Sequence, residues 1–201
     1  MGKTQSNRRV VFQPGTHEGL RRGINQMTEA VIPTLGPLPR IVALNQVVTD
    51  KMPEMIDKGG VIARRIIALP DRDADMGAML AREMLWGLQD QYGDGTATAA
   101  VLLRTIYNEG VKYVTAGGNA MTLKRSLEAG LEMVIEELDK MTRPVEGQKD
   151  LARIAETICQ DPDLADVLGE VFDHIGEYGQ LEIRRLRSRK IYREYVDGMF
   201  W

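Results

Sequence analysis

Three helical patterns follow one another between residues 75 and 141, and they constrain the fold more than any other feature of the sequence. Apolar side chains recur there every three or four residues, which places them on one face of an α-helix. We expect Asp75 to cap the first helix, whose methionines should help to fill the core. Its ridge is Met76, Leu80, Met84, Leu88 and Tyr92. The second pattern consists of Val101, Leu102, Thr105, Ile106 and Val114 and ends at Gly117-Gly118. The third follows the N-cap candidate Asn119 and consists of Leu123, Leu127, Leu131, Val134, Ile135, Leu138 and Met141.

Shorter elements precede these helices. A helical pattern from Gly15 to Ile32 is ended by Pro33. Residues 41–44 ("IVAL") are a strand candidate, and a second strand or hairpin is expected between residues 46 and 60. Residues 8–13 ("RRVVFQ") form a further β-like patch, and a short helix is expected over residues 61–69. The predicted fold class is therefore mainly α with short β-hairpins.

A boundary is expected where Pro144 and Gly147 interrupt the helical pattern. Two shorter helices should follow, over residues 148–159 and 164–175. The period then changes to two, so "QLEIRRL" and "IYREYVDGMF" are predicted to be strands joined by a basic, solvated turn. The chain ends at Trp201 on an apolar strand without terminal punctuation, and we expect a sequence that is cut short.

Composition excludes several classes of protein. With 43% apolar residues among 201, the chain can bury a sizeable core, and a net charge of −3 gives no general attraction to nucleic acid or anionic membranes. A single cysteine, Cys159, and two histidines exclude an internal disulfide and a Cys/His zinc site. The sequence contains neither a signal-peptide pattern nor an apolar stretch of membrane-spanning length. We therefore expect a cytoplasmic protein with no nucleic-acid partner and no membrane.

The stretch "GDGTATAAVLL", Gly93 to Leu103, is the main candidate for chemistry. Standing alone, it would be as readily explained by a helix N-cap made by Asp94 or Thr96. Two further glycine turns, Thr34 to Pro37 and Lys58 to Gly60, favour a phosphate site lined by N–H groups and hydroxyls. In such a site Asp94 would hold a Mg²⁺ ion that bridges to phosphate oxygens. The turns match neither a Walker A loop nor a GxGxxG dinucleotide turn.

These segments resemble the N-terminal portion of group I chaperonins, the GroEL type of 60-kDa chaperonin. The family's Thr-Leu-Gly-Pro-Lys-Gly-Arg is similar to residues 34–40, and its Gly-Asp-Gly-Thr-Thr-Thr-Ala-Thr-Val-Leu to residues 93–102. Its Asn-Pro-Met-Asp-Leu-Lys-Arg-Gly is similar to residues 119–126, and its Val-Glu-Gly-Met-Gln-Phe to the segment from Val196 to Phe200. Order and spacing agree from Val10 to Phe200, about the first third of such a protein.

The resemblance implies a domain organisation. Residues 1–141 would be the N-terminal part of an equatorial ATP-binding domain, a helical bundle. Residues 142–197 would be the N-terminal part of an α/β intermediate domain, and residues 198–201 the start of an apical domain. Pro144 and Gly198 would be the hinges. Both discontinuous domains would be completed by sequence outside this chain.

The resemblance also implies a nucleotide site for ATP and Mg²⁺, and leaves open a K⁺ ion. The residues carried over are Thr34, Leu35, Gly36, Pro37, Lys58, Asp94, Gly95, Thr96, Ala97 and Thr98, with Asp94 as the Mg²⁺ ligand. A family aspartate that assists hydrolysis is Gly59 here, a loop threonine is Ala97, and Lys-Gly has become Leu38-Pro39. The family's main catalytic aspartate would lie outside the chain, so the catalytic residues are unassigned.

Two functions follow from the resemblance. The first is a subunit of an ATP-dependent chaperone that assists protein folding. The alternative is a chaperonin-like structural or holdase subunit that binds nucleotide weakly or does not hydrolyse it, for which Gly59, Ala97 and Pro39 are the reasons. We expect hydrolysis to require the complete protein. The implied partners are further copies in a ring and unfolded polypeptides, and a co-chaperonin is left open.

Overall fold

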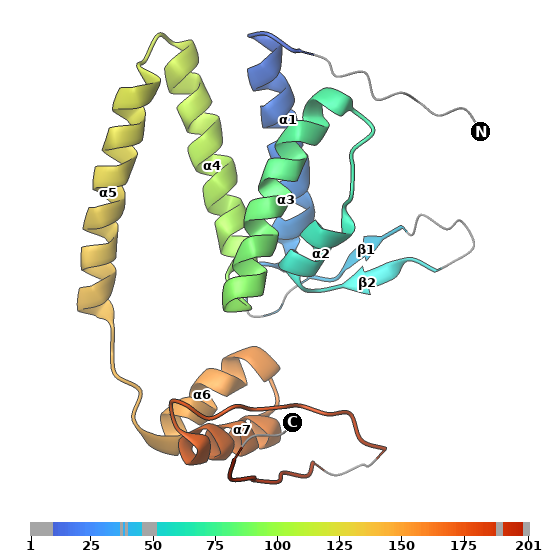
Figure 1. Ribbon diagram of the computed structural model, residues 1–201, viewed down its shortest axis with the longest axis vertical. Coiled ribbons are helices and arrows are strands. Elements are labelled where there is room, and N and C mark those ends of the chain that lie inside the picture. The colour runs from blue at the N-terminus through green and yellow to red at the C-terminus, as the bar shows by residue number, and fades with distance from the viewer. Residues whose placement is uncertain (1–9, 37, 39, 46–51, 188–190, 199–201) are drawn as a thin grey trace. The chain divides into compact units, whose positions relative to one another are not determined.

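The structure is a computed structural model that describes residues 10–36, 38, 40–45, 52–187 and 191–198 (Figure 1). The chain divides into two compact units, Met1–Thr142 and Arg143–Trp201, each described here by itself. The first unit contains α1 (Gly15–Val31), the 3₁₀ turn η1 (Ile32–Thr34), β1 (Val42–Leu44), β2 (Glu54–Ile56), α2 (Gly59–Arg65), α3 (Arg72–Tyr92), α4 (Thr96–Thr115) and α5 (Ala120–Met141). The second contains α6 (Gly147–Cys159) and α7 (Pro162–Ile175). The prediction of a mainly helical fold is confirmed.

The close packing of α1 against α3 organises the first unit (Figure 1). Three glycines lie in this contact, where any side chain would collide with backbone. A Cβ at Gly23 would overlap the Ala74 carbonyl oxygen, and one at Gly77 would overlap the Leu20 carbonyl oxygen. The third, Gly19, would bring its Cβ to 2.7 Å from the Asp73 carbonyl oxygen. The two helices therefore approach backbone to backbone through small residues.

This packing reverses the expected orientation of α3. The buried face of α3 consists of Ala74, Gly77, Ala78, Ala81 and Leu85. The predicted core ridge lies outside instead, with Met76 45% exposed, Leu80 62% and Met84 41%. The interpretation of these methionines as core filler was wrong, because α1 approaches too closely for long side chains to fit between the helices.

The apolar core of the first unit lies where α1, α2, α3 and α4 meet. Its largest fully buried apolar side chains are Met27, Val31, Ile62 and Leu85. Tyr107 of α4 packs against this cluster, and burial raises the pKa of its hydroxyl. The C-terminal end of α1 and the N-terminal end of α2 are therefore anchored in the core.

The N-cap of α3 is Asp71 rather than Asp75, so that prediction was wrong. The Asp71 carboxylate accepts a hydrogen bond of 3.0 Å from Asp73 N, and it forms a 2.9 Å ion pair with Arg22 of α1. The Arg22 guanidinium holds the pKa of Asp71 below its ordinary value. Asp75 instead accepts a 2.7 Å hydrogen bond from Leu69 N, which fixes the loop that precedes the helix.

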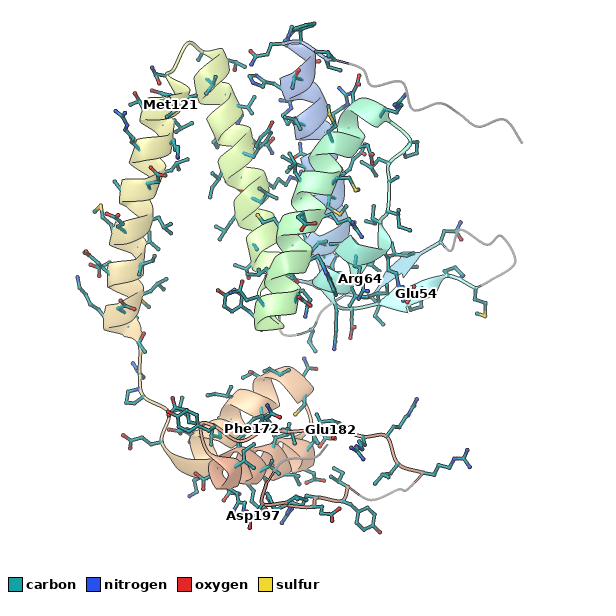
Figure 2. The ribbon with its side chains drawn as sticks, viewed as in Figure 1. Glu54, Arg64, Met121, Phe172, Glu182 and Asp197 are labelled. Atoms are coloured by element: carbon teal, nitrogen blue, oxygen red, sulfur yellow. The ribbon has the colours of Figure 1, made fainter. Side chains whose placement is uncertain are left out.

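The hairpin of β1 and β2 is antiparallel, with Ala43 opposite Met55, and it confirms the expected pair of strands. It is joined to α2 by an ion pair of 2.9 Å between Arg65 and Glu54. The neighbouring Arg64 places its guanidinium 4.5 Å from the centre of the Trp86 ring of α3. Figure 2 shows Glu54 and Arg64 where the hairpin and α2 meet. These contacts hold α2 between the hairpin and α3.

Helix α5 begins at the predicted N-cap, since the Asn119 side chain accepts hydrogen bonds from Met121 N and Thr122 N at 2.8 and 3.1 Å. None of its residues is buried. The predicted apolar stripe is uncovered over most of its length, from Leu127, 46% exposed, to Met141, 74% exposed. At its N-terminal end Leu123 reaches α4, where it would lie 3.5 Å from a Cβ at Gly110.

In the second unit α6 and α7 pack as a pair through Gly169, whose Cβ would lie 2.8 Å from that of Ala152. The strands expected after α7 are not present in residues 180–187 and 191–198. Side chains tie this segment to α7 instead: Arg193 forms a 2.7 Å ion pair with Glu170, and the rings of Tyr195 and His174 lie 4.3 Å apart. Alternating apolar residues do not form a sheet here because a strand needs a neighbouring backbone to bond.

The β-like patch at residues 8–13 is likewise not a strand in its described part, residues 10–13. Val11 and Phe12 instead accept hydrogen bonds from Thr16 in the first turn of α1, through their carbonyl oxygens. The backbone of the patch is thus drawn into the start of a helix. Among the described helices, none combines the length and the apolar character that crossing a membrane requires.

Candidate functional site

The three glycine turns singled out in the sequence meet at Gly59. A Cβ placed on this residue would lie 2.8 Å from Thr96 Oγ1 and 3.0 Å from Thr34 Oγ1. Both hydroxyl-bearing residues are buried, Thr34 to 8% and Thr96 to 6% exposure. Residues separated by more than 60 positions in the sequence therefore present two hydroxyls to one glycine backbone.

The first turn is shaped by the end of α1. Pro33 lies in η1, and the Thr34 hydroxyl donates a 2.8 Å hydrogen bond to the Val31 carbonyl oxygen. The turn closes through Arg40 N, which donates to the Pro33 carbonyl oxygen at 3.1 Å. Gly36 has φ of +110°, a conformation that favours glycine. Leu35 is exposed, while Pro37 and Pro39 lie outside the described residues.

The loop between α3 and α4 depends on two glycines in the left-handed region, Gly93 at φ +75° and Gly95 at φ +81°. Between them, Asp94 is exposed, and its Oδ1 accepts a 2.6 Å hydrogen bond from Gly95 N. Thr96 is the first residue of α4, so the backbone N–H groups of the first helical turn, which have no partner within the helix, lie at this point. The loop thus places a carboxylate at the surface beside a buried hydroxyl.

The remaining predicted residues differ in their surroundings. Lys58 is exposed and is the N-cap residue of α2, with its carbonyl oxygen accepting from Ile62 N at 3.1 Å. Thr98 is exposed on the first turn of α4. Ala97, by contrast, packs its methyl group against the core. Ala97 therefore makes an apolar contact with the core at the position where the resemblance implies a threonine hydroxyl.

The cradle around Gly59 offers hydroxyls and a helix N-terminus, which suit a phosphate group in their chemistry, while the space at Gly59 itself is closed by Val31 and the two threonines. Asp94 is a suitable oxygen ligand for Mg²⁺, which proteins often hold by one or two carboxylates together with substrate phosphates and water. The described residues contain no cluster of three or more His, Cys, Asp or Glu that could hold a metal ion. Asp94 is thus suited to a Mg²⁺ ion that takes its other ligands from the phosphate and from water.

Sequence reasoning missed one residue at this site, Gln89 in the last turn of α3. Its side chain donates a 2.7 Å hydrogen bond to the Gly93 carbonyl oxygen and lies against Gly60. Its position four residues before Gly93 was the available signal, because residues one helical turn apart are neighbours. That signal does not separate Gln89 from the exposed residues around it.

Gly59→Ala is expected to displace the two threonine hydroxyls. Its new methyl group would lie 2.8 Å from both Thr96 Oγ1 and Val31 Cγ1, and such overpacking costs about 1–3 kcal/mol of the free energy of unfolding. Urea denaturation measures this change. The matched control is Gly130→Ala in α5, where a Cβ meets no described atom within 4 Å. Equal stability of the two variants would contradict the close packing at Gly59.

The fold is that of a chaperonin. The family model described as "TCP-1/cpn60 chaperonin family" matches residues 27–175, which is most of the chain. The chain belongs to the TCP-1/cpn60 chaperonin family. The match includes Thr34, Gly59 and the Gly93–Thr98 loop.

Solved structures with this fold include the chaperonin gp146 from the bacteriophage EL 2 (Pseudomonas aeruginosa), determined in the presence of ATP-BeFx. In one crystal form, the gp146 chain shares 22% sequence identity with this chain and has a TM-score of 0.65. The match covers 79% of this chain and 28% of the gp146 chain. A group III chaperonin in the open state is 20% identical with a TM-score of 0.67, over 82% of this chain and 33% of that one. The chain therefore spans a third or less of the length of these chaperonins. These matches establish the chaperonin family, and the assignment to group I stays a prediction.

Proposed function

We propose that this chain supplies part of the ATP site of a chaperonin subunit that assists protein folding. The observation that carries the proposal is the meeting of Thr34 and Thr96 at Gly59, because it brings together the turns expected to surround a phosphate. Membership of the chaperonin family supports it. The related gp146 was determined in the presence of ATP-BeFx, which makes a nucleotide the natural ligand to test.

Each residue has a proposed role that follows from its surroundings. The turn from Thr34 to Pro37 and the Gly95–Thr98 segment would contact the nucleotide through backbone groups and hydroxyls, and exposed Lys58 would add a positive charge. The exposed Asp94 carboxylate would hold Mg²⁺, with K⁺ left open as a second cation. When bound, Mg²⁺ would neutralise phosphate charge and polarise the phosphoryl group.

We propose that residues 1–141 are the N-terminal part of an equatorial domain, with its remaining part covering the apolar stripe of α5. Most of that stripe is exposed, and a contiguous apolar face of this kind is usually covered in a stable protein. Residues 142–197 would belong to the intermediate domain and residues 198–201 to the apical domain. Nucleotide binding would then bias movement about Pro144 and Gly198.

The assembled protein is proposed to be a group I type ring of identical subunits in the cytoplasm. Ring formation is typical of the family to which the chain belongs. Unfolded polypeptides would bind through the apical domain, with a co-chaperonin left open. The net charge of −3 favours neither nucleic acid nor an anionic membrane as a partner.

A second function is favoured by the closed space at Gly59. An aspartate there would collide with Val31 and both threonines, and Ala97 is committed to the core. Both features weaken hydrolysis more than binding, so a structural or holdase subunit with slow turnover is the alternative.

Phosphate release by the full-length oligomer distinguishes the two functions. Turnover that is stimulated by Mg²⁺ and abolished by EDTA supports the ATP-dependent chaperone. Binding of ATP without phosphate release above the protein-free rate supports the holdase. Absence of both binding and release would contradict the nucleotide site itself.

A further inference from the structure

Gln89 forms hydrogen bonds to both backbone polar groups of Gly93, its N–H and its carbonyl oxygen. The Gly93 N–H donates a 2.9 Å hydrogen bond to the Gln89 carbonyl oxygen, and the Gln89 side-chain amide donates a 2.7 Å hydrogen bond to the Gly93 carbonyl oxygen. The second bond acts on the peptide that joins Gly93 to Asp94. Because a peptide unit is planar, fixing this oxygen fixes the direction in which Asp94 begins.

The same side chain packs against the start of α2. A Cβ at Gly60 would lie 2.5 Å from Cβ and Cγ of Gln89 and 2.6 Å from its Oε1, and Gly60 is buried. Gln89 therefore contacts the loop that carries Asp94 and the helix that carries Gly59. It connects two of the three turns that meet at the cradle.

This connection matters because the backbone of the loop depends on two glycines. Gly93 and Gly95 both adopt left-handed conformations, and glycine is the residue least restricted in its backbone angles. The Asp94 carboxylate lies between them and is exposed. The 2.6 Å hydrogen bond from Gly95 N orients the carboxylate within the loop, while the contacts of Gln89 tie the loop to α2.

We propose that Gln89 is a positioning residue, which fixes the Gly93–Asp94 peptide against Gly60 so that Asp94 is oriented for a Mg²⁺-bound phosphate. The inference rests on the nucleotide site of the proposed function. It assigns to Gln89 no contact with nucleotide. Its effect should therefore appear chiefly in the part of the affinity that Mg²⁺ provides.

Gln89→Met tests this role, because methionine keeps the length of the side chain over Gly60 but removes the amide donor. Loss of one hydrogen bond of this kind is expected to weaken Mg²⁺-ATP binding by about three- to tenfold. In EDTA no Mg²⁺ is available to Asp94, so the affinity for ATP should change by less than about twofold. Both affinities are measured by calorimetry on the full-length protein, together with its thermal unfolding temperature. The matched control is Gln91→Met, at an exposed position of the same helix.

The outcomes separate this inference from the proposed function. If the unsubstituted protein binds Mg²⁺-ATP and Gln89→Met binds it as tightly as Gln91→Met does, the role of Gln89 is overturned and the nucleotide site stands. Equal weakening in Mg²⁺ and in EDTA would indicate a merely structural role and would also overturn it. If the unsubstituted protein binds no nucleotide, both fail. Should Gln89→Met not unfold cooperatively, Gln89→Glu, which also lacks the donor, decides by the same comparison.

Discussion

Gly23→Ala is expected to destabilise the first unit by about 3 kcal/mol or more, at the upper end of the range for overpacked cores. The added methyl group would overlap the Ala74 carbonyl oxygen and lie 2.5 Å from Ala78 N, and both atoms belong to the backbone of α3. A helix backbone cannot move aside as a flexible side chain can. The two helices would have to separate, and the core around Met27 and Leu85 would open. Chemical denaturation followed by circular dichroism measures the loss.

The matched control is Gly87→Ala, on α3 itself. A Cβ at Gly87 meets no described atom within 4 Å, and alanine favours a helix by up to about 1 kcal/mol relative to glycine. This variant should be as stable as the unsubstituted protein or more stable. Similar stability of Gly23→Ala and Gly87→Ala would show that α1 and α3 do not approach each other at Gly23.

Asp94→Ala is expected to abolish the gain in ATP affinity that Mg²⁺ provides. Asp94 is the carboxylate that the GDGT loop carries at the surface beside Thr96, and Mg²⁺ binding depends on such an oxygen ligand. Calorimetric titrations should then give the same affinity with Mg²⁺ and with EDTA.

Asp94→Asn refines this prediction. An asparagine retains an oxygen that can accept the 2.6 Å hydrogen bond from Gly95 N, so the loop should persist while the negative charge is lost. The Mg²⁺-dependent gain should be greatly reduced in this variant as well. Asp90→Ala, at an exposed position near the end of α3, is the control and should bind as the unsubstituted protein does. Full Mg²⁺ dependence in Asp94→Asn would remove Asp94 from the site.

Much of the fold could be predicted because local signals determine it. The Asn119 N-cap, the glycines around Asp94 and the stop at Pro33 each act within one helical turn, and the structure places helix ends at all three. Periodicity also predicted α5 correctly. It could not predict whether another element covers the stripe, and in the described chain most of the stripe is uncovered.

The wrong predictions concern what surrounds each element in the fold, and not the helical period of its sequence. The ridge of Met76, Leu80 and Met84 is a true helical stripe, yet α3 turns its small residues towards α1 because Gly23 and Gly77 permit close approach. Asp75 and Asp71 are both reasonable caps. Asp71 makes the cap bond to Asp73 N and also pairs with Arg22, 49 residues away, which the local pattern does not show. The strands expected after α7 required a partner that the pattern could not supply.

The site was partly predictable for the same reason. Three glycine turns could be found individually, but their meeting point at Gly59 depends on how α1, α2 and α4 pack. From the resemblance, Gly59 could be recognised only as the position where the family has an aspartate and this chain does not. The structure gives it a positive role, since Val31 and the two threonines occupy the space that a side chain would need.

The central claim, that Thr34, Gly59 and the Gly93–Thr98 loop form a nucleotide site, is tested most directly by titrating ATP into the full-length protein. The account predicts one nucleotide bound per chain, with higher affinity in Mg²⁺ than in EDTA. An absence of binding under both conditions, or binding that is indifferent to Mg²⁺, would contradict it.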